Sequence, residues 1–267
     1  MDTLVVNLRI FRFAFNSGVA DWRAMYTVKT WTFGWLGRIL CQVVFFVLVG
    51  RYIGVPGTVR FLVIGNAVFI LAQSVLFSIF TTCGERFSGT YAFLICAPGP
   101  MFAAFVGRSA QWVLDGALCS VASILLLGPL FGLTMPMPTG LLVVPIVFLT
   151  ACSVYGFGLT VGGLVLRMVH MRALAANVSL FFLMLLTGVQ VPGTFWPSPL
   201  RLFTQMLPLT HGLDAVRDLL AGAGLGRILT AVVSEVGVGA VWFAIAAWVF
   251  HAGAEKARRD GTVDFGG

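Results

Sequence analysis

Six long apolar stretches constrain this sequence more than any other feature, because each can cross a lipid bilayer as a single helix. They cover residues 35–53, 61–82, 101–128, 140–166, 173–191 and 228–250. A transmembrane helix needs about 20 mostly apolar residues, whereas a strand of a membrane barrel needs about ten residues of alternating character. Only 10% of the residues are charged and the mean hydropathy is +0.97, while soluble domains are about a quarter charged. The sequence therefore predicts an all-α integral membrane protein with six transmembrane helices.

The residues before the first stretch predict a helix that lies on the membrane surface. Within residues 3–15, apolar side chains recur at helical spacing, at Leu4, Leu8, Phe11 and Phe15. Polar side chains fall elsewhere on the helical wheel, which is typical of an amphipathic interfacial helix. We expect residues 1–34 to form this cytoplasmic interfacial segment, residues 35–250 to form the transmembrane domain, and residues 251–267 to form a cytoplasmic tail.

The connection between the fifth and sixth stretches, residues 192–227, differs from an ordinary loop. It contains four prolines, at positions 192, 197, 199 and 208, yet nearly half of its residues are apolar. Proline ends helices, and backbone at membrane depth must stay hydrogen-bonded, so we expect two short re-entrant helices at the outer face. The second, at residues 209–221, places its leucines on one side and Asp214 and Arg217 on the other.

The distribution of basic residues predicts the orientation of the chain. With six spans, 12 of the 17 Lys and Arg residues fall on one side of the membrane and five on the other. The side that is richer in these residues normally faces the cytoplasm. We therefore expect both termini and residues 83–98 to be cytoplasmic. The net charge of +7 is explained by this asymmetry, and no nucleic-acid partner is expected.

Residues 83–98 interrupt the apolar pattern with an adjacent acid and base. Glu85 and Arg86 lie between Gly84 and Gly89, and a short apolar stretch follows before Pro98. An ordinary loop with an amphipathic tail would account for this pattern. A short cytoplasmic helix offered to a partner protein would also account for it, and the residues alone leave both interpretations open.

The types and spacing of reactive residues argue against catalysis on this chain. A Walker phosphate-binding loop needs a Gly-Lys pair, but Lys29 follows Val28 and Lys256 follows Glu255. The three histidines are far apart and the five cysteines form no C-x-x-C pair, which disfavours a metal site or a histidine-based catalytic site. We predict that the chain is not an enzyme and has no cofactor or metal of its own.

Several polar side chains lie inside the apolar stretches. An ionised carboxylate costs a few kcal/mol there, so Asp115 and Glu235 should each face the bundle interior, find a partner or be protonated. Arg108, Gln111 and Asp115 are spaced to form one polar stripe along a helix. Such groups could line a transport route or hold helices together. The possible route-lining residues are Asn66, Gln73, Gln111, Asp115 and Gln190.

Two segments resemble the permease subunits of ABC exporters of the second type, a family that includes drug, lipid, polysaccharide and nodulation-factor exporters. Glu85-Arg86-x-x-Gly89-Thr90, followed by Pro98, is similar to the family's stretch between its second and third spans. The segment from Leu207 to Arg217 is similar to the one before the family's last span, where a proline, a hydroxyl residue and an acid-x-x-arginine ending recur. The amphipathic start and the six spans extend the resemblance over almost the whole chain.

This resemblance implies an assembly. Residues 83–98 would contain a coupling helix that docks on a separate ATP-binding subunit, present in two copies, and a second permease copy or a homologue would complete the route. ATP and Mg would be bound by the partner ATPase. The residues implied in coupling are Glu85, Arg86, Gly89, Thr90 and Phe93. Those implied at an outer gate are Pro208, Thr210, Asp214 and Arg217.

The function expected from these features is outward movement of an amphiphilic cargo, such as a drug, lipid or glycolipid, through the membrane. Two other classes stay open. One is a proton-coupled secondary carrier that uses Asp115 and Glu235. The other is a membrane-embedded enzyme that acts on lipid.

Overall fold

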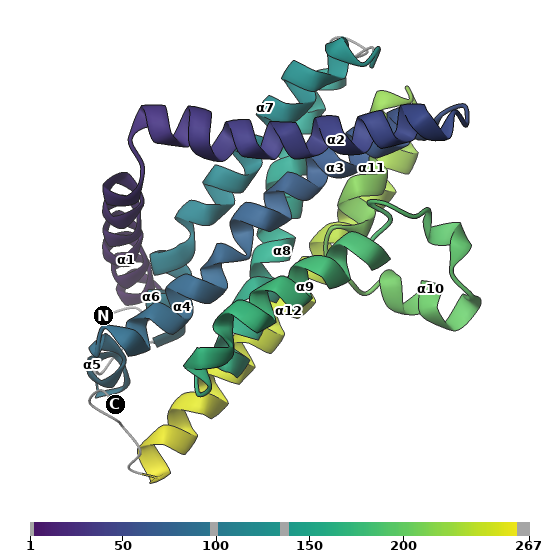
Figure 1. Cartoon of the computed structure of the whole chain (residues 1–267). Helices are drawn as coiled ribbons and strands as arrows, with labels where there is room; N and C mark the ends of the chain where they lie inside the picture. The colour runs from purple at the N-terminus through teal and green to yellow at the C-terminus, as the bar shows by residue number, and fades with distance from the viewer. Residues whose placement is uncertain (1–2, 97–100, 134–138, 261–267) are drawn as a thin grey trace.

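The computed structural model describes residues 3–96, 101–133 and 139–260, and these residues form an all-helical bundle (Figure 1). Helix accounts for 87% of the structure, and the described residues contain no strand. Six helices are long and apolar enough to cross a membrane, which confirms that part of the prediction and is compatible with a multi-pass membrane protein. They are Thr30–Ile53, Thr58–Phe87, Met101–Leu130, Thr139–Val165, Val169–Leu186 and Leu225–Arg259.

Several of these long helices are divided into shorter elements. The first half of the chain contains α1 (Thr3–Met25), the π-helix η1 (Thr30–Leu36), α2 (Gly37–Ile53), α3 (Thr58–Val75), α4 (Phe77–Phe87), α5 (Thr90–Cys96), α6 (Met101–Ser109) and α7 (Gln111–Leu130). The second half contains the short 3₁₀-helix η2 (Thr139–Leu142), α8 (Val143–Val165), η3 (Val169–Met171), α9 (Arg172–Leu186), η4 (Gly193–Phe195), α10 (Ser198–Thr204), α11 (Thr210–Leu220) and α12 (Leu225–Asp260).

The bundle has two ends that differ in what they contain. The start of α1, the short helix α5 and the end of α12 lie at one end, here called the terminal end (Figure 1). The α2–α3 turn, α10 and α11 lie at the other, here called the opposite end. The two ends are connected by α8, by α12, and by α3 and α4, which follow each other in the span Thr58–Phe87.

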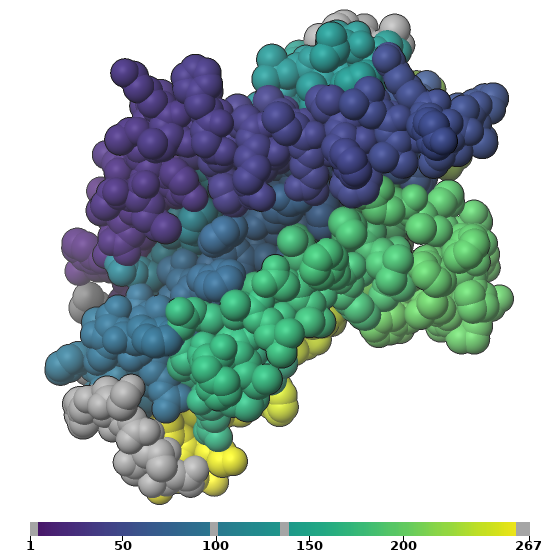
Figure 2. Space-filling model, viewed as in Figure 1, coloured from purple at the N-terminus to yellow at the C-terminus, as the bar shows by residue number. Residues whose placement is uncertain are grey.

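The centre of the bundle is formed by α3 and α8. In Thr58–Phe87, 89% of the most apolar window is buried, whereas the corresponding values are 28% for Thr30–Ile53 and 17% for Leu225–Arg259. A helix that is apolar on all sides is buried or faces lipid. The helices α2 and α9 lie on the face shown in Figure 2, and many of their exposed side chains are large and apolar. These faces match a lipid environment.

Three helix boundaries differ from those expected. The first helix extends to Met25 rather than ending near residue 15, and the fifth span ends at Leu186, so Gln190 lies beyond it. The second span continues to Phe87 instead of breaking at Cys83. Gly84 does not break this helix, and the turn falls at Gly89, which has a φ of +70° that disfavours other residues. Pro98 lies outside the described residues.

The third span consists of two helices rather than one. It divides at Ala110 into α6 and α7. Arg108 lies on α6 and turns toward α1 and α4, while Asp115 lies on α7 and contacts Trp31. The residues of the predicted polar stripe still share one side, which faces α1: Arg108 pairs with Asp21, Gln111 lies against Gly18, and Asp115 lines a cavity with Trp22.

Helix α1 packs closely against α6 through glycine. A Cβ atom added at Gly107 would lie 2.5 Å from the carbonyl oxygen of Phe11 and 2.8 Å from Cβ of Ala14. A Cβ at Gly18 would meet the carbonyl oxygen of Arg108. Backbone atoms cannot rotate away as side chains do, so the distance between α1 and α6 depends on these two glycines.

Gly107→Ala is accordingly expected to lower the free energy of unfolding by about 1–3 kcal/mol, as overpacking does in other tightly packed sites. The matched control is Gly237→Ala on α12, where no atom lies within 4 Å of an added Cβ. That change should be neutral or slightly stabilising, because alanine favours helix by up to about 1 kcal/mol over glycine. Thermal unfolding of both purified variants in detergent measures the difference, and equal unfolding temperatures would contradict the packing argument.

Candidate functional site

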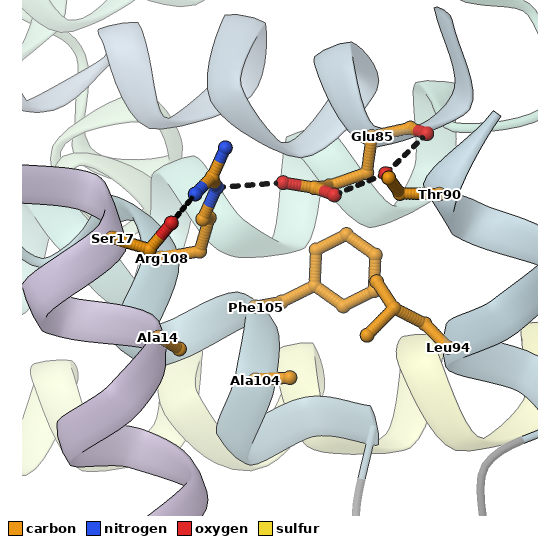
Figure 3. Close-up of a pocket in the computed structure, with 8 residues that line it drawn as sticks. All are labelled: Ala14, Ser17, Glu85, Thr90, Leu94, Ala104, Phe105 and Arg108. Atoms are coloured by element: carbon orange, nitrogen blue, oxygen red, sulfur yellow. Dashed lines mark hydrogen bonds and ion pairs between the residues drawn. The ribbon is translucent and has the colours of Figure 1, made fainter. Parts of the chain in front are cut away.

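Arg108 joins three helices at the terminal end of the bundle. Its Nε donates to Oε1 of Glu85 on α4 at 2.8 Å, and its Nη2 pairs with Oδ2 of Asp21 on α1 at 2.6 Å. Its Nη1 donates to the hydroxyl of Ser17, also on α1 (Figure 3). Each guanidinium nitrogen thus has a different partner, a geometry that suits arginine and that lysine cannot reproduce.

The two ion pairs of Arg108 are unequal in strength. The Glu85 side chain is 12% exposed and that of Asp21 is 56% exposed. Exposed pairs contribute about 0–1 kcal/mol, whereas a charge left unpaired in a buried position is costly. The contact between α4 and α6 through Glu85 is therefore the dominant one.

The short helix α5 is attached to this cluster through Thr90. The Thr90 hydroxyl donates to Oε2 of Glu85 at 2.5 Å and lies 2.9 Å from the carbonyl oxygen of the same residue (Figure 3). We call Ser17, Asp21, Glu85, Thr90 and Arg108 the Arg108 network. Through it, α5 is connected by hydrogen bonds and ion pairs to α4, α6 and α1.

A cavity of about 250 Å³ lies beside the Arg108 network. Its polar side is formed by Glu85, Thr90 and Arg108, and the ring of Phe105 lies between Glu85 and Leu94 (Figure 3). Because this space separates part of α5 from α1, the two helices are linked through the network rather than by close packing.

Further contacts anchor the terminal end around α5. The guanidinium of Arg258 on α12 donates from Nη2 to the carbonyl oxygen of Ile95 at 2.9 Å. Arg86 donates to the carbonyl oxygens of Leu166 and Arg167, at 3.1 Å and 3.0 Å, where α8 ends. Cations are favoured at helix C-termini, where carbonyl oxygens lack partners. The ends of α4, α8 and α12 are thereby held close to α5.

The residues predicted for coupling occupy different positions here. Glu85 and Arg86 belong to the last turn of α4, Gly89 makes the turn, and Thr90 and Phe93 are on α5. Phe93 is 71% exposed, so its ring points away from the bundle. Sequence reasoning missed Asp21, Ser17 and Arg258 as parts of this region, because their partners are distant in sequence.

Arg217 organises the opposite end. Its Nη2 donates to the carbonyl oxygen of Gly188 at 2.8 Å, and its guanidinium lies 3.9 Å from the ring centre of Phe61. Asp214 is 4.0 Å away. Burial lowers the pKa of Arg217 to about 10, so the group stays charged at neutral pH. This guanidinium links α11 to α3 and to the segment after α9.

Two predicted route-lining amides join Arg217 at this end. Nε2 of Gln190 donates to Oδ1 of Asn66 at 2.8 Å. The backbone passes so close that a Cβ at Gly65 would meet the carbonyl oxygen of Val189 and lie 3.2 Å from Nη2 of Arg217. Arg217 of the predicted outer gate and the predicted route-lining residues Asn66 and Gln190 therefore form one cluster.

The start of α11 is held by a buried acid on α12. Oε1 of Glu235 accepts the backbone N–H of Leu209 at 2.8 Å, and Oε2 accepts that of Gly212 at 2.9 Å. Glu235 is 1% exposed, which agrees with the expectation that it would face the interior and find a partner. A carboxylate at a helix N-terminus satisfies N–H groups that have no partner within the helix.

The other two predicted gate residues, Pro208 and Thr210, belong to the turn that precedes α11. Leu209 follows Pro208 and has a φ of +84°, which is unusual for a residue with a side chain. The hydroxyl of Thr210 donates to the carbonyl oxygen of Thr204 at 2.8 Å, which ties α11 to the end of α10. The Glu235 contacts and this bond together hold the strained turn in place.

The remaining route-lining residues belong to separate contacts. Nε2 of Gln73 on α3 donates to Oε1 of Gln42 on α2 at 3.0 Å. Asp115, which is 4% exposed, accepts a hydrogen bond from the indole Nε1 of Trp31 at 2.7 Å. The five predicted residues thus fall into three groups along the bundle rather than one continuous line.

No protein-family model matches the chain, and no curated protein matches it. The six apolar helices are compatible with a multi-pass membrane protein.

Proposed function

We propose that this chain is the membrane-spanning subunit of an ATP-driven exporter whose ATP hydrolysis takes place on a separate subunit. The observation that carries the proposal is the position of α5. Its exposed Phe93 offers an apolar contact to a partner, while Thr90 on the same helix connects to α4, α6 and α1 through the Arg108 network. A partner that pushes on α5 would move helices that extend across the bundle.

The contacts also provide a path to the opposite end. Arg86 holds the end of α8, and α8 packs along α12 and α11. A Cβ at Gly212 on α11 would collide with the side chain of Thr150 on α8. Because packed helices move as rigid bodies between discrete arrangements, a shift of α8 at the terminal end would displace α11 and α10.

In this proposal the terminal end faces the cytoplasm of a bacterium and α10 and α11 dip into the outer face of the plasma membrane. Two permease copies, or this chain and a homologue, assemble with two ATP-binding subunits that carry ATP and Mg. The cargo is an amphiphile such as a drug, lipid or glycolipid. A proton-coupled carrier is less well supported, because both oxygens of Glu235 already accept backbone hydrogen bonds.

Copurification tests this proposal directly. A tagged chain extracted from its own membranes is expected to bring down an ATP-binding subunit in equal amount. Phe93→Asp should abolish this association without lowering the quantity of membrane protein, since it places a charge at an exposed apolar contact. Phe93→Leu is the matched control and should retain the partner. A chain that purifies alone from native membranes would contradict the proposal.

A further inference from the structure

The outward side of α1 carries three arginines that lie in one row along the helix. Arg9 and Arg12 are neighbours on the helix surface, and Arg23 follows Arg12 after about three helical turns. All three side chains are exposed. Asn16, one turn after Arg12, is exposed as well. A polar row, here called the arginine row, therefore extends along most of α1.

The other side of α1 is used for packing against the bundle. A Cβ at Gly18 would meet the backbone of α6, so this side of α1 is in close contact with that helix. The rings of Phe11 and Phe15 are half-buried and stack on each other with their centres 6.1 Å apart. Part of the apolar side that the sequence predicts for residues 3–15 thus contacts protein, and the arginine row is the side of α1 that stays free.

The acids of the protein do not neutralise the arginine row. Arg9, Arg12 and Arg23 form no ion pair with any residue that the structure describes. Asp21 is the only acid among residues 3–25, and it is already paired with Arg108. Like charges at neighbouring positions on a helix surface repel one another. An anionic partner would therefore be attracted to this side of α1 and would relieve the repulsion.

The apolar neighbours of the arginines indicate which kind of anion they meet. On a helical wheel Leu8 and Phe13 fall on either side of the arginine row, and their side chains are 64% and 74% exposed. A basic face with apolar side chains beside it is typical of a helix in the headgroup layer, where the cations attract anionic lipid and the apolar groups reach the acyl chains. A soluble acidic partner would need to supply an apolar surface as well as negative charge, whereas a lipid leaflet supplies both.

We propose that the arginine row binds the headgroups of anionic phospholipids, while Leu8 and Phe13 contact the upper part of the acyl chains. Guanidinium groups bind phosphate well, and Figure 2 shows that α1 lies on the outside of the molecule. A zwitterionic headgroup would also bring an ammonium group, which the arginines would repel. The proposal does not depend on ATP-driven export, because the arginine row is on a different side of α1 from Asp21 and its contact with Arg108.

The test measures which lipid stays bound to the purified chain. Protein equilibrated with vesicles of equal phosphatidylglycerol and phosphatidylethanolamine is transferred to detergent and examined by native mass spectrometry. We expect preferential retention of phosphatidylglycerol. The double variant Arg9→Gln, Arg12→Gln should lower this preference by about fivefold for each arginine removed, as expected for a cation at a membrane surface. The double variant Arg9→Lys, Arg12→Lys keeps both charges and should retain most of the preference.

The matched control removes two exposed arginines from the opposite end of the bundle. Arg51 is in the last turn of α2 and Arg201 is on α10, so Arg51→Gln with Arg201→Gln changes the net charge equally and should leave the lipid preference unchanged. Equal retention of the two lipids by the wild type would overturn the proposal. An unchanged preference in the Arg9→Gln, Arg12→Gln variant, or an equal loss in the control, would overturn it too, because the preference would then not come from α1.

Discussion

Arg108→Ala is expected to uncouple ATP hydrolysis from transport, lowering the amount of cargo moved per ATP by at least about tenfold. The change removes the partner of all three groups that the guanidinium binds, on α4 and on α1. Hydrogen bonds to charged groups contribute about 1.5–3 kcal/mol each. Glu85 would keep its hydrogen bond from Thr90 but lose its cation, so movement of α5 and α4 would no longer pull α6 and α1 with it.

In reconstituted vesicles that contain the chain and its ATP-binding partner, the rate of ATP hydrolysis and the rate of cargo transport can be measured together. Arg108→Lys should be intermediate, because one ammonium cannot serve three partners in different directions. Arg12→Ala, which removes an exposed cation from α1, is the matched control and should leave coupling intact. The double variant Glu85→Ala, Arg108→Ala should move no less cargo per ATP than either single variant, because both changes remove the same contact. Normal coupling in Arg108→Ala would show that the network does not transmit the motion.

Glu235→Ala is expected to lower the free energy of unfolding by about 2–5 kcal/mol and to loosen α11. The backbone N–H groups of Leu209 and Gly212 would both lose their acceptor in a buried position, and each unsatisfied group costs about 1–3 kcal/mol. The turn at Leu209, with its φ of +84°, would then lack the contacts that hold it. Glu235→Gln should be intermediate, because an amide offers one acceptor oxygen and places donors against the other N–H.

Hydrogen exchange resolved by peptide separates local from global effects of this change. Protection of 209–220 should fall in Glu235→Ala and recover in part in Glu235→Gln. Glu255→Ala is the control on the same helix, since Glu255 is half-exposed and pairs with His251 near the end of α12. Unchanged protection of α11 in Glu235→Ala would mean that other contacts hold this helix.

The sequence was most informative where a pattern is local. The six spans follow from length and hydropathy. The apolar side of residues 209–221 appears in the structure as the buried Leu209, which precedes α11, and the buried Leu213 and Val216 of α11. Within the predicted interruption at residues 83–98, the turn falls at Gly89, because glycine accepts positive φ without strain. Helix ends were less accurate: the pattern around Gly84 looked like a break, but its residues still satisfy their hydrogen bonds within α4.

Length, hydropathy and the spacing of glycine and proline were thus enough to predict helices, their number and most of their order, because these properties act within one or two turns of chain. The partners of the charged groups were decided by tertiary packing. Asp115 pairs with Trp31 across 84 residues, and Glu85 pairs with Arg108 across 23. A buried charge signals that it needs a partner, but which helix supplies that partner depends on how the helices pack against one another.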